Sequence, residues 1–296
     1  MTTGKPKPTL KAHTGFQIAS ACLSPDGSRM ITVELPPPPW SGGLPPCVVH
    51  MTDTTSGRSW KLADGNGSAT FSPDGKRAYV AVSGWGAKKE GSLLVFDREG
   101  KAKPPLVRLG ELLCGSPVVS RDGKWLVAKV SKGRERGSNT QKVFDLATGK
   151  VVADIASRSD VRLFGAMFSP DGRFLAVLDT NGYLRVYDVA KWNVVLEHEL
   201  KGGNYGGVLA FTNDGRRLAV PMQAKRELTR LGEPDPLDYP QPRIYLFDLT
   251  KPKSAPEEIV CPHGWARSVA FSADGKMLAF GSTGAVHLFD VSGPAK

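Results

Sequence analysis

Residues 166–189 read AMFSPDGRFLAVLDTNGYLRVYDV, and the fold of the chain follows from this stretch. Three short apolar runs in it are separated by the turn sequences SPDG, at 169–172, and NG, at 181–182. Runs of this length between turn residues are typical of strands, and the last run alternates with a period of two. The stretch therefore predicts a three-stranded antiparallel meander. Alone it would be marginal, because one small sheet has nothing to bury its faces against.

Both turns contain the residue types that tight turns require. Pro170 presets φ at the second position, Asp171 hydrogen-bonds to the local backbone, and Gly172 accepts the positive φ that closes the hairpin. Asn181 and Gly182 favour a two-residue turn of the mirror-image type, whose twist matches that of the flanking strands. We therefore expect each turn to join two antiparallel strands.

The SPDG turn recurs along the whole chain. Its copies are CLSPDG (22–27), TFSPDG (70–75), VVSRDG (118–123), MFSPDG (167–172), AFTNDG (210–215) and AFSADG (270–275). Each copy precedes a small apolar strand, and all but the first continue with a strand that ends in an aromatic residue and Asp. The turn glycines are spaced by 48, 48, 49, 43 and 60 residues. Because a period of forty-odd residues with four strands is typical of a propeller blade, we predict an all-β, six-bladed β-propeller with four-stranded antiparallel blades.

This pattern resembles the WD-repeat family of β-propellers. The SPDG turns carry the resemblance, together with the aromatic-Asp pairs in place of Trp-Asp and the segments HTG (13–15) and HGW (263–265), which resemble the family's Gly-His element. Phe or Tyr replaces Trp in every pair, and the Gly-His element is absent before copies two to five. The family's internal hydrogen-bond network is therefore largely missing, so apolar packing must hold the blades. A TolB-like propeller, which shares the SPDG turn, is the nearby alternative.

The two ends of the sequence predict how the ring closes. The last copy stops before a fourth strand, and an extended N-terminal segment precedes the first turn. We expect this N-terminal strand to complete the last blade, which removes the exposed sheet edges of an open array. The chain is then a single domain of residues 1–296. Its blades lie at roughly 14–62, 63–109, 110–155, 156–200, 201–260, and 261–296 plus 5–13.

The composition restricts the class of protein. The 33 Gly and 23 Pro among 296 residues fit a turn-rich fold, and no apolar run has the length of a signal peptide or membrane span. The four cysteines lie far apart without a CxxC pair, which favours a reducing, cytoplasmic location. A formal net charge of +10 favours an acidic partner, and we expect a monomer with no membrane contact.

The insertions between strands are the expected partner-binding segments, because sequence variation on a propeller's loop-rich face carries its specificity. One insertion presents a Trp after four prolines, others carry basic residues, and the longest, at 223–242, reads as a lid or docking loop. The candidate partner-binding residues are Trp40, Trp85, Lys88, Lys89, Lys132, Arg134, Arg136, Arg158, Arg162, Arg226 and Arg230. The alternative is a side chain packed on the blade surface for Trp40, a solvated basic surface for the charged residues, and a disordered surface excursion for the 223–242 insertion.

Catalytic motifs are mostly absent from the sequence. The five His residues lack metal-ligand spacing, and neither a phosphate-binding loop nor a GxSxG elbow occurs. The Asp residues that end the third strands (53, 97, 145, 188, 248 and 290) are explained by turn hydrogen bonding. We therefore expect no enzyme, no catalytic residues, no metal and no cofactor.

Three functions remain as hypotheses. The first is a non-catalytic scaffold of WD-repeat type that binds protein partners through its loop-rich face. The second is a binder of nucleic acid or another polyanion through the basic residues of the insertions, with affinity that falls steeply with salt. The third, of lower weight, is a metal-dependent propeller hydrolase or lactonase, whose ligands come from several blades and leave no local motif.

Overall fold

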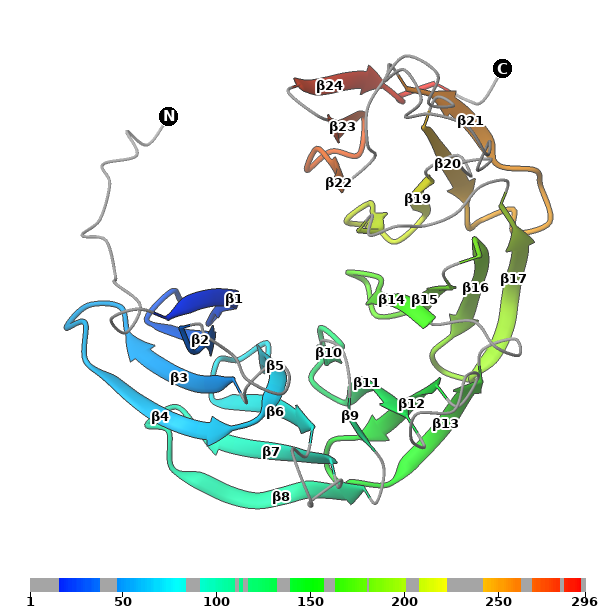
Figure 1. Ribbon diagram of the computed structural model, residues 1–296. Helices are drawn as coiled ribbons and strands as arrows, with labels where there is room; N and C mark the ends of the chain where they lie inside the picture. Colours follow the sequence, from blue (N-terminus) through cyan, green and yellow to red (C-terminus); the bar gives the residue numbers. More distant parts are fainter. Residues whose placement is uncertain are drawn as a thin grey trace, which may run out of the picture. The chain divides into compact units, whose positions relative to one another are not determined.

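The computed structural model consists of β-strands joined by turns (Figure 1). It describes residues 16–37, 47–83, 91–109, 112–113, 117–131, 139–156, 163–179, 181–200, 208–222, 242–261, 268–282 and 285–293. Every regular element in these ranges is a strand, which confirms the all-β class. None of the described residues belongs to a helix that has the length and apolar character to cross a membrane. The N-terminal strand expected at 5–13 lies outside the described residues.

The chain divides into two compact units, Met1–Ile155 and Ala156–Lys296. In the first unit, three antiparallel sheets follow one another along the chain (Figure 1). Their strands are β1 (Gln17–Leu23), β2 (Arg29–Leu35), β3 (Val48–Asp53) and β4 (Ser59–Asp64); β5 (Asn66–Phe71), β6 (Arg77–Ser83), β7 (Gly91–Asp97) and β8 (Ala102–Leu109); and β10 (Val118–Val119), β11 (Trp125–Ser131), β12 (Asn139–Asp145) and β13 (Val151–Ala156), with β9 (Leu112–Leu113) paired to β11. The first strand of each sheet lies beside that of the next, β1 by β5 and β5 by β10.

The second unit also contains three antiparallel sheets. Their strands are β14 (Leu163–Phe168), β15 (Phe174–Asp179), β16 (Tyr183–Asp188) and β17 (Asn193–Glu199); β18 (Ala210–Phe211), β19 (Arg217–Met222), β20 (Arg243–Asp248) and β21 (Glu257–Val260); and β22 (Ser268–Phe271), β23 (Met277–Ser282) and β24 (Ala285–Asp290). Strands pair in sequence order within each sheet, so each sheet is a meander. The organising stretch forms β14 to β16, as its apolar runs predict.

The core of each unit lies between successive sheets. Val49 and Met51 of β3 pack with Val80 of β6, and all three are fully buried or nearly so. In the second unit, Leu184 of β16 packs against the next sheet in the same way, within a cluster that includes Leu218. Side chains alternate between the two faces along each strand. The middle sheet of each unit therefore packs one face against the preceding sheet and the other face against the next. Apolar packing between the sheets of a unit is therefore the main source of its stability.

All six SPDG-type turns form the same hydrogen-bond network. In the fourth turn, the Ser169 hydroxyl donates to Asp171 Oδ1 at 2.6 Å and accepts from the backbone N–H of Phe174 at 2.9 Å. The same carboxylate oxygen accepts from the backbone N–H of Arg173 at 3.1 Å, and Gly172 has a φ of 77°. Equivalent bonds begin at Ser24, Ser72, Ser120, Thr212 and Ser272. The turn chemistry predicted for Pro170–Gly172 is confirmed.

The mirror-image turn predicted for Asn181-Gly182 is wrong. Such a turn needs positive φ at both central residues, but only Gly182 has it, at 87°. The Gly182 N–H bonds to the Asp179 carbonyl at 3.2 Å, which places Asn181 inside a longer turn. Asp179 Oδ1 accepts from the N–H groups of Asn181 and Tyr183, both at 2.9 Å. This buried carboxylate holds the loop in a shape that the dipeptide alone does not specify.

Successive turns also pack on one another within a unit. In the second unit, a Cβ added at Gly215 would overlap the Asp171 carboxylate of the preceding sheet. That carboxylate cannot move without losing its bonds to Ser169 and to Arg173. Because Gly215 has a φ of 67°, both its backbone conformation and its missing side chain are needed there. The turns therefore set the spacing of neighbouring sheets as well as joining strands.

We predict that Gly215→Ala destabilises the protein more than Gly172→Ala. Both residues have a positive φ, near 70°, which costs an alanine about 1–2 kcal/mol. A Cβ at Gly172 meets nothing within 4 Å, whereas one at Gly215 displaces the Asp171 carboxylate and adds about 1 kcal/mol. Urea denaturation of the two variants measures the difference. Equal losses of unfolding free energy would contradict the close packing of successive turns.

Candidate functional site

The partner-binding residues expected from sequence all lie outside the described residues. They are Trp40, Trp85, Lys88, Lys89, Lys132, Arg134, Arg136, Arg158, Arg162, Arg226 and Arg230. The described strands nevertheless define where their segments are attached. Four segments join the second strand of a sheet to the third, after β2, β6, β11 and β19, and one joins β13 to β14. All five attach at the end of a sheet that lies opposite its SPDG-type turn. We call this end of the sheet the loop end, and we call the end that carries the SPDG-type turn the turn end.

The positive charge of the chain lies mostly outside the described strands and turns. Of the 39 Lys and Arg and the 29 Asp and Glu, the described residues hold 23 and 21. The described part is thus almost neutral. The remaining segments hold 16 basic and 8 acidic residues. The excess charge of the chain therefore belongs mainly to the connections and to the two ends of the sequence.

The third-strand Asp residues are held by their own turns, as the sequence predicts. Asp53 Oδ1 accepts from the backbone N–H groups of Thr55 and Ser56, at 2.9 and 2.8 Å. Asp248 Oδ1 accepts from the N–H and hydroxyl of Thr250, at 2.9 and 2.6 Å, and the hydroxyl bond is the main cause of its lowered pKa. These carboxylates are charged at neutral pH and already occupied, so they act as structural caps.

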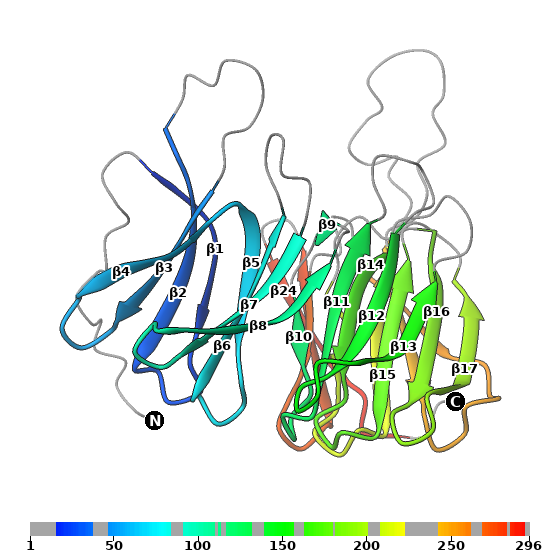
Figure 2. The same ribbon diagram turned by 90° about the horizontal axis from the view of Figure 1, so that it is seen from below.

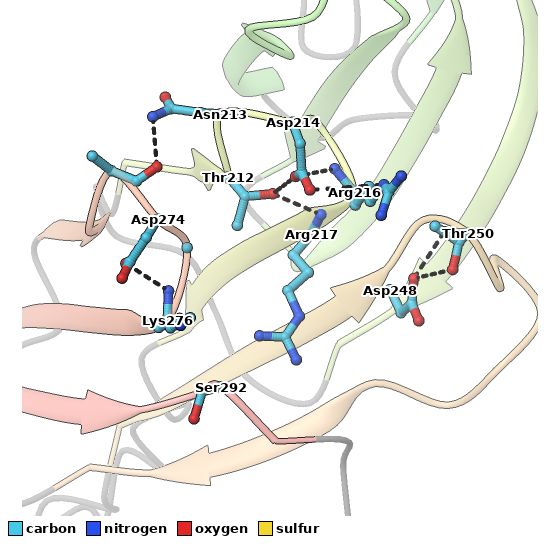
Figure 3. Close-up of a pocket in the computed structure, with 12 residues that line it drawn as sticks. Thr212, Asn213, Asp214, Arg216, Arg217, Asp248, Thr250, Asp274, Lys276 and Ser292 are labelled. Atoms are coloured by element: carbon cyan, nitrogen blue, oxygen red, sulfur yellow. Dashed lines mark hydrogen bonds and ion pairs between the residues drawn. The ribbon is translucent and has the colours of Figure 1, made fainter.

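A recess of about 440 Å³ opens at the turn end of the second unit, between the β18–β21 sheet and the β22–β24 sheet (Figure 3). The turn that precedes β19, the end of β20 and the turn that precedes β23 line it. Three cations and three carboxylates face this space, and they come from both sheets. They are Arg216, Arg217, Lys276, Asp214, Asp248 and Asp274.

The carboxylates of this recess are committed to the turns. Asp214 Oδ1 accepts from the Thr212 hydroxyl at 2.6 Å and from the Arg216 N–H at 3.0 Å. Asp274 Oδ1 is held in the same way by Ser272, at 2.5 Å, and by the backbone N–H of Lys276. The hydroxyl bonds are the main reason why the pKa values of both carboxyl groups lie below the usual range. Neither group has the raised pKa of a general acid.

Arg217 differs from its neighbour in that its guanidinium is fixed by main-chain oxygens. It donates to the carbonyl oxygens of Val291 and Gly293, which follow the last strand of the next sheet. In Figure 3 the Arg217 side chain runs from its strand towards the segment that carries Ser292. The neighbouring Arg216 is 67% exposed, and its Nε lies 3.7 Å from Asp214. Arg217 therefore joins two sheets, whereas Arg216 remains at the surface.

The described residues that line the recess contain no arrangement for nucleophilic chemistry. Its hydroxyls are engaged, since Thr250 donates to Asp248 and Ser292 to Asp290. Sequence reasoning did not find this recess, because its residues come from copies of the repeat that lie 60 positions apart. One signal was visible in the sequence: a Lys or Arg follows the turn glycine in all copies but the first.

Neither the cysteine thiols nor the potential metal ligands of the described residues form a reactive centre. Burial raises the pKa of both the Cys22 and the Cys261 thiol to about 11, so neither is a thiolate at neutral pH. Across the described ranges, no three His, Cys, Asp or Glu side chains are placed to hold one metal ion.

The comparisons with known proteins show the fold and no family. No protein-family model matches the chain, and no curated protein matches it. Among solved structures, a chain of Kuenenia stuttgartiensis hydrazine synthase is similar, with a TM-score of 0.58 and 18% identity over 98% of this chain and 99% of that one. In all, 1549 solved chains match. The likeness supports a β-propeller-like, all-β fold.

The expectation that the chain is not an enzyme is corrected by this comparison. It rested on the absence of local catalytic motifs, yet one similar solved chain belongs to an enzyme, hydrazine synthase. A propeller-like chain that assembles a site from distant repeats leaves no local motif, so missing motifs do not exclude catalysis. At 18% identity the likeness carries the fold alone and assigns no reaction to this chain.

We predict that Arg217→Ala destabilises the protein by about 1–2 kcal/mol, because it removes charge-assisted bonds to two carbonyl oxygens. Arg216→Ala is the matched control, and we expect a change within about 0.5 kcal/mol for this exposed residue. Thermal unfolding measures both. Equal effects would contradict the assignment of Arg217 as the link between the two sheets.

Proposed function

We propose that this chain is a closed six-bladed β-propeller of WD-repeat type that binds an acidic protein partner through the segments at its loop end. The observation that carries the proposal is the distribution of charge. Three of the loop-end segments, 84–90, 132–138 and 157–162, contain seven basic and three acidic residues, whereas the described strands and turns contain 23 and 21. An excess of one sign on connecting segments favours encounter with a surface of the opposite sign.

The turn end is a weaker candidate for this partner, because several of its cations are paired with carboxylates of the turns. Arg29 lies 2.5 Å from Asp53, and Arg98 lies 2.7 Å from Asp26 in the neighbouring turn. Arg173 pairs with Asp171 in the same manner. A surface whose cations are already paired offers little long-range attraction, so the unbalanced segments at the loop end are favoured.

The test is a nuclease-treated pull-down from native lysate that compares wild type with a variant in which Lys88, Lys89, Arg134 and Arg136 are changed to Glu. We expect discrete proteins to copurify with the wild type and to be lost from the variant, because the reversed charges repel an acidic partner. In the matched control, four basic residues at the turn end are changed to Glu: Arg58, Lys101, Lys191 and Lys253. We expect this control variant to retain the partners.

The same charge distribution supports a second candidate, a binder of nucleic acid or another polyanion. The two candidates differ in the pull-down. If untreated wild type captures nucleic acid and no protein remains after nuclease, the polyanion function replaces the protein-binding one. Its affinity would also fall steeply with salt, since each phosphate contact releases counterions. The affinity of a protein interface with an apolar centre changes much less with salt concentration.

The exposed face of the last sheet supports the proposed closure of the propeller ring. Val286 and Leu288 of β24 are 72% and 67% exposed, whereas their equivalents in β20, Ile244 and Leu246, are buried at 0% and 4%. The β22–β24 sheet also has one strand fewer than the sheet before it. We propose that residues 5–13 add the missing strand beside β24 and that closure of the ring covers this face.

We predict that deleting residues 1–12 lowers the melting temperature sharply, because the edge of β24 and an apolar face lose their cover. Leu288→Ser is expected to destabilise by about 2 kcal/mol if the face is covered in solution. Val151→Ser is its control, since Val151 is 45% exposed on the last strand of another sheet. An unchanged melt for the deletion, or equal effects of the two Ser variants, would remove the closure model.

A further inference from the structure

We propose that the recess between the second and third turns, at the turn end of the first unit, is a binding site for a phosphate group. The recess has a volume of about 460 Å³. The turn that precedes β6 and the turn that precedes β11 line it, together with the start of β6. It lies at the end of the sheets opposite the segments assigned to the protein partner, so the two proposals rest on different residues.

Three cations line the recess: Lys76, Arg77 and Arg121. The side chains of all three are exposed. Tyr79, which also lines it, is buried at 2% exposure, and its pKa is raised chiefly by that burial, so its hydroxyl stays protonated at neutral pH. Two guanidinium groups, an ammonium group and a phenol can together supply the several donors that a phosphate accepts.

The two carboxylates of the recess neutralise only part of this positive charge, since Asp74 interacts electrostatically with Lys76 and Arg77. Asp74 Oδ1 accepts from the Ser72 hydroxyl at 2.6 Å and from the Lys76 N–H at 3.0 Å. Asp122 Oδ1 accepts from the Ser120 hydroxyl at 2.6 Å, and Asp122 Oδ2 lies 3.9 Å from the Lys124 ammonium. Three cations against two committed carboxylates leave a formal excess of positive charge around the recess.

The sequence of the third turn supplies the distinguishing residue. The second position of this turn is Pro25, Pro73 and Pro170 in three copies, because proline presets the backbone there. The third copy has Arg121 at that position, and Arg121 is the only charged residue at the second position of the six turns. The substitution replaces the proline with an arginine that lines the recess.

The recess between the fifth and sixth turns is a natural control. It has nearly the same volume, about 440 Å³ against about 460 Å³, and is built from the equivalent parts of the repeat. Asn213 and Ala273 occupy the second positions of its turns, and its three cations are matched by three carboxylates. We expect this neutral recess to have no preference for an anion.

A phosphate fits these donors better than a carboxylate does. A phosphate monoester carries close to two negative charges at neutral pH and three acceptor oxygens, so it can bond to more than one guanidinium at once. The volume also exceeds what a bare phosphate needs, which leaves room for the group that carries it. A free phosphorylated metabolite and a phosphorylated side chain of a protein present the same chemistry.

The test is isothermal titration calorimetry of the full chain with inorganic phosphate, at constant ionic strength set with chloride. We expect saturable binding by the wild type and at least a tenfold loss in Arg121→Pro, since one charge-assisted bond is equivalent to roughly that factor. Arg121→Pro retains the turn, because proline occupies this position in three other copies. Arg216→Ala, in the neutral recess, is expected to bind as the wild type does.

A second titration identifies the source of the phosphate. A short peptide with one phosphoserine is compared with its unphosphorylated form and with inorganic phosphate. Tighter binding of the phosphopeptide than of the free ion indicates a protein source, and equal binding indicates a free metabolite. The loop-end variant with four Glu must bind phosphate as the wild type does, which separates this proposal from the proposed function. Absence of binding by the wild type, or equal binding by Arg121→Pro, would overturn the site.

Discussion

The rest of the structure depends on one hydrogen-bond network, in which a turn hydroxyl bonds to both an Asp carboxylate and a backbone N–H. In the fourth turn the hydroxyl belongs to Ser169, which is completely buried, and it caps the N–H of Phe174 at the start of β15. Without it that N–H has no partner at the point where the second strand enters the core. The network therefore sets the register of the first two strands, and the third and fourth strands pair outward from them. Figure 2 shows strands of the β10–β13 and β14–β17 sheets running side by side from their turns.

The same network explains why carboxylates of the turns lie beside cations. Asp171 and Asp214 each lie beside the cation that follows their turn glycine, Arg173 and Arg216. In the first turn that position is Ser28, and the cation comes instead from Arg98 of the next sheet, 2.7 Å from Asp26. A carboxylate that must stay charged to cap its turn thus has a cation beside it. The remaining positive charge of the chain belongs mainly to segments that build no turn.

Differences between copies of the repeat are more informative about function than the fold is. A propeller-like fold is shared with an enzyme at 18% identity, so the fold by itself assigns no activity. The residues that all copies share are those that make turns and cores. Arg121 replaces a turn proline and gains a charge, and Arg217 extends to the next sheet where Phe174 stands in the fourth copy. Such departures add charged side chains at positions where the shared residues already determine the backbone.

The sequence by itself determined the strands, their order and the SPDG turns, because each depends on a few neighbouring residues and recurs with one period. The Asn181-Gly182 turn was mispredicted, because the carboxylate of Asp179 rather than the dipeptide decides its shape. The recesses at the turn end needed the tertiary structure, since their residues lie in different copies. Leu246 and Leu288 stand in the same Leu-Phe-Asp motif, yet one is buried at 4% and the other is 67% exposed. Only the tertiary structure decides between them, because burial depends on the surface that covers a side chain and not on the segment that carries it.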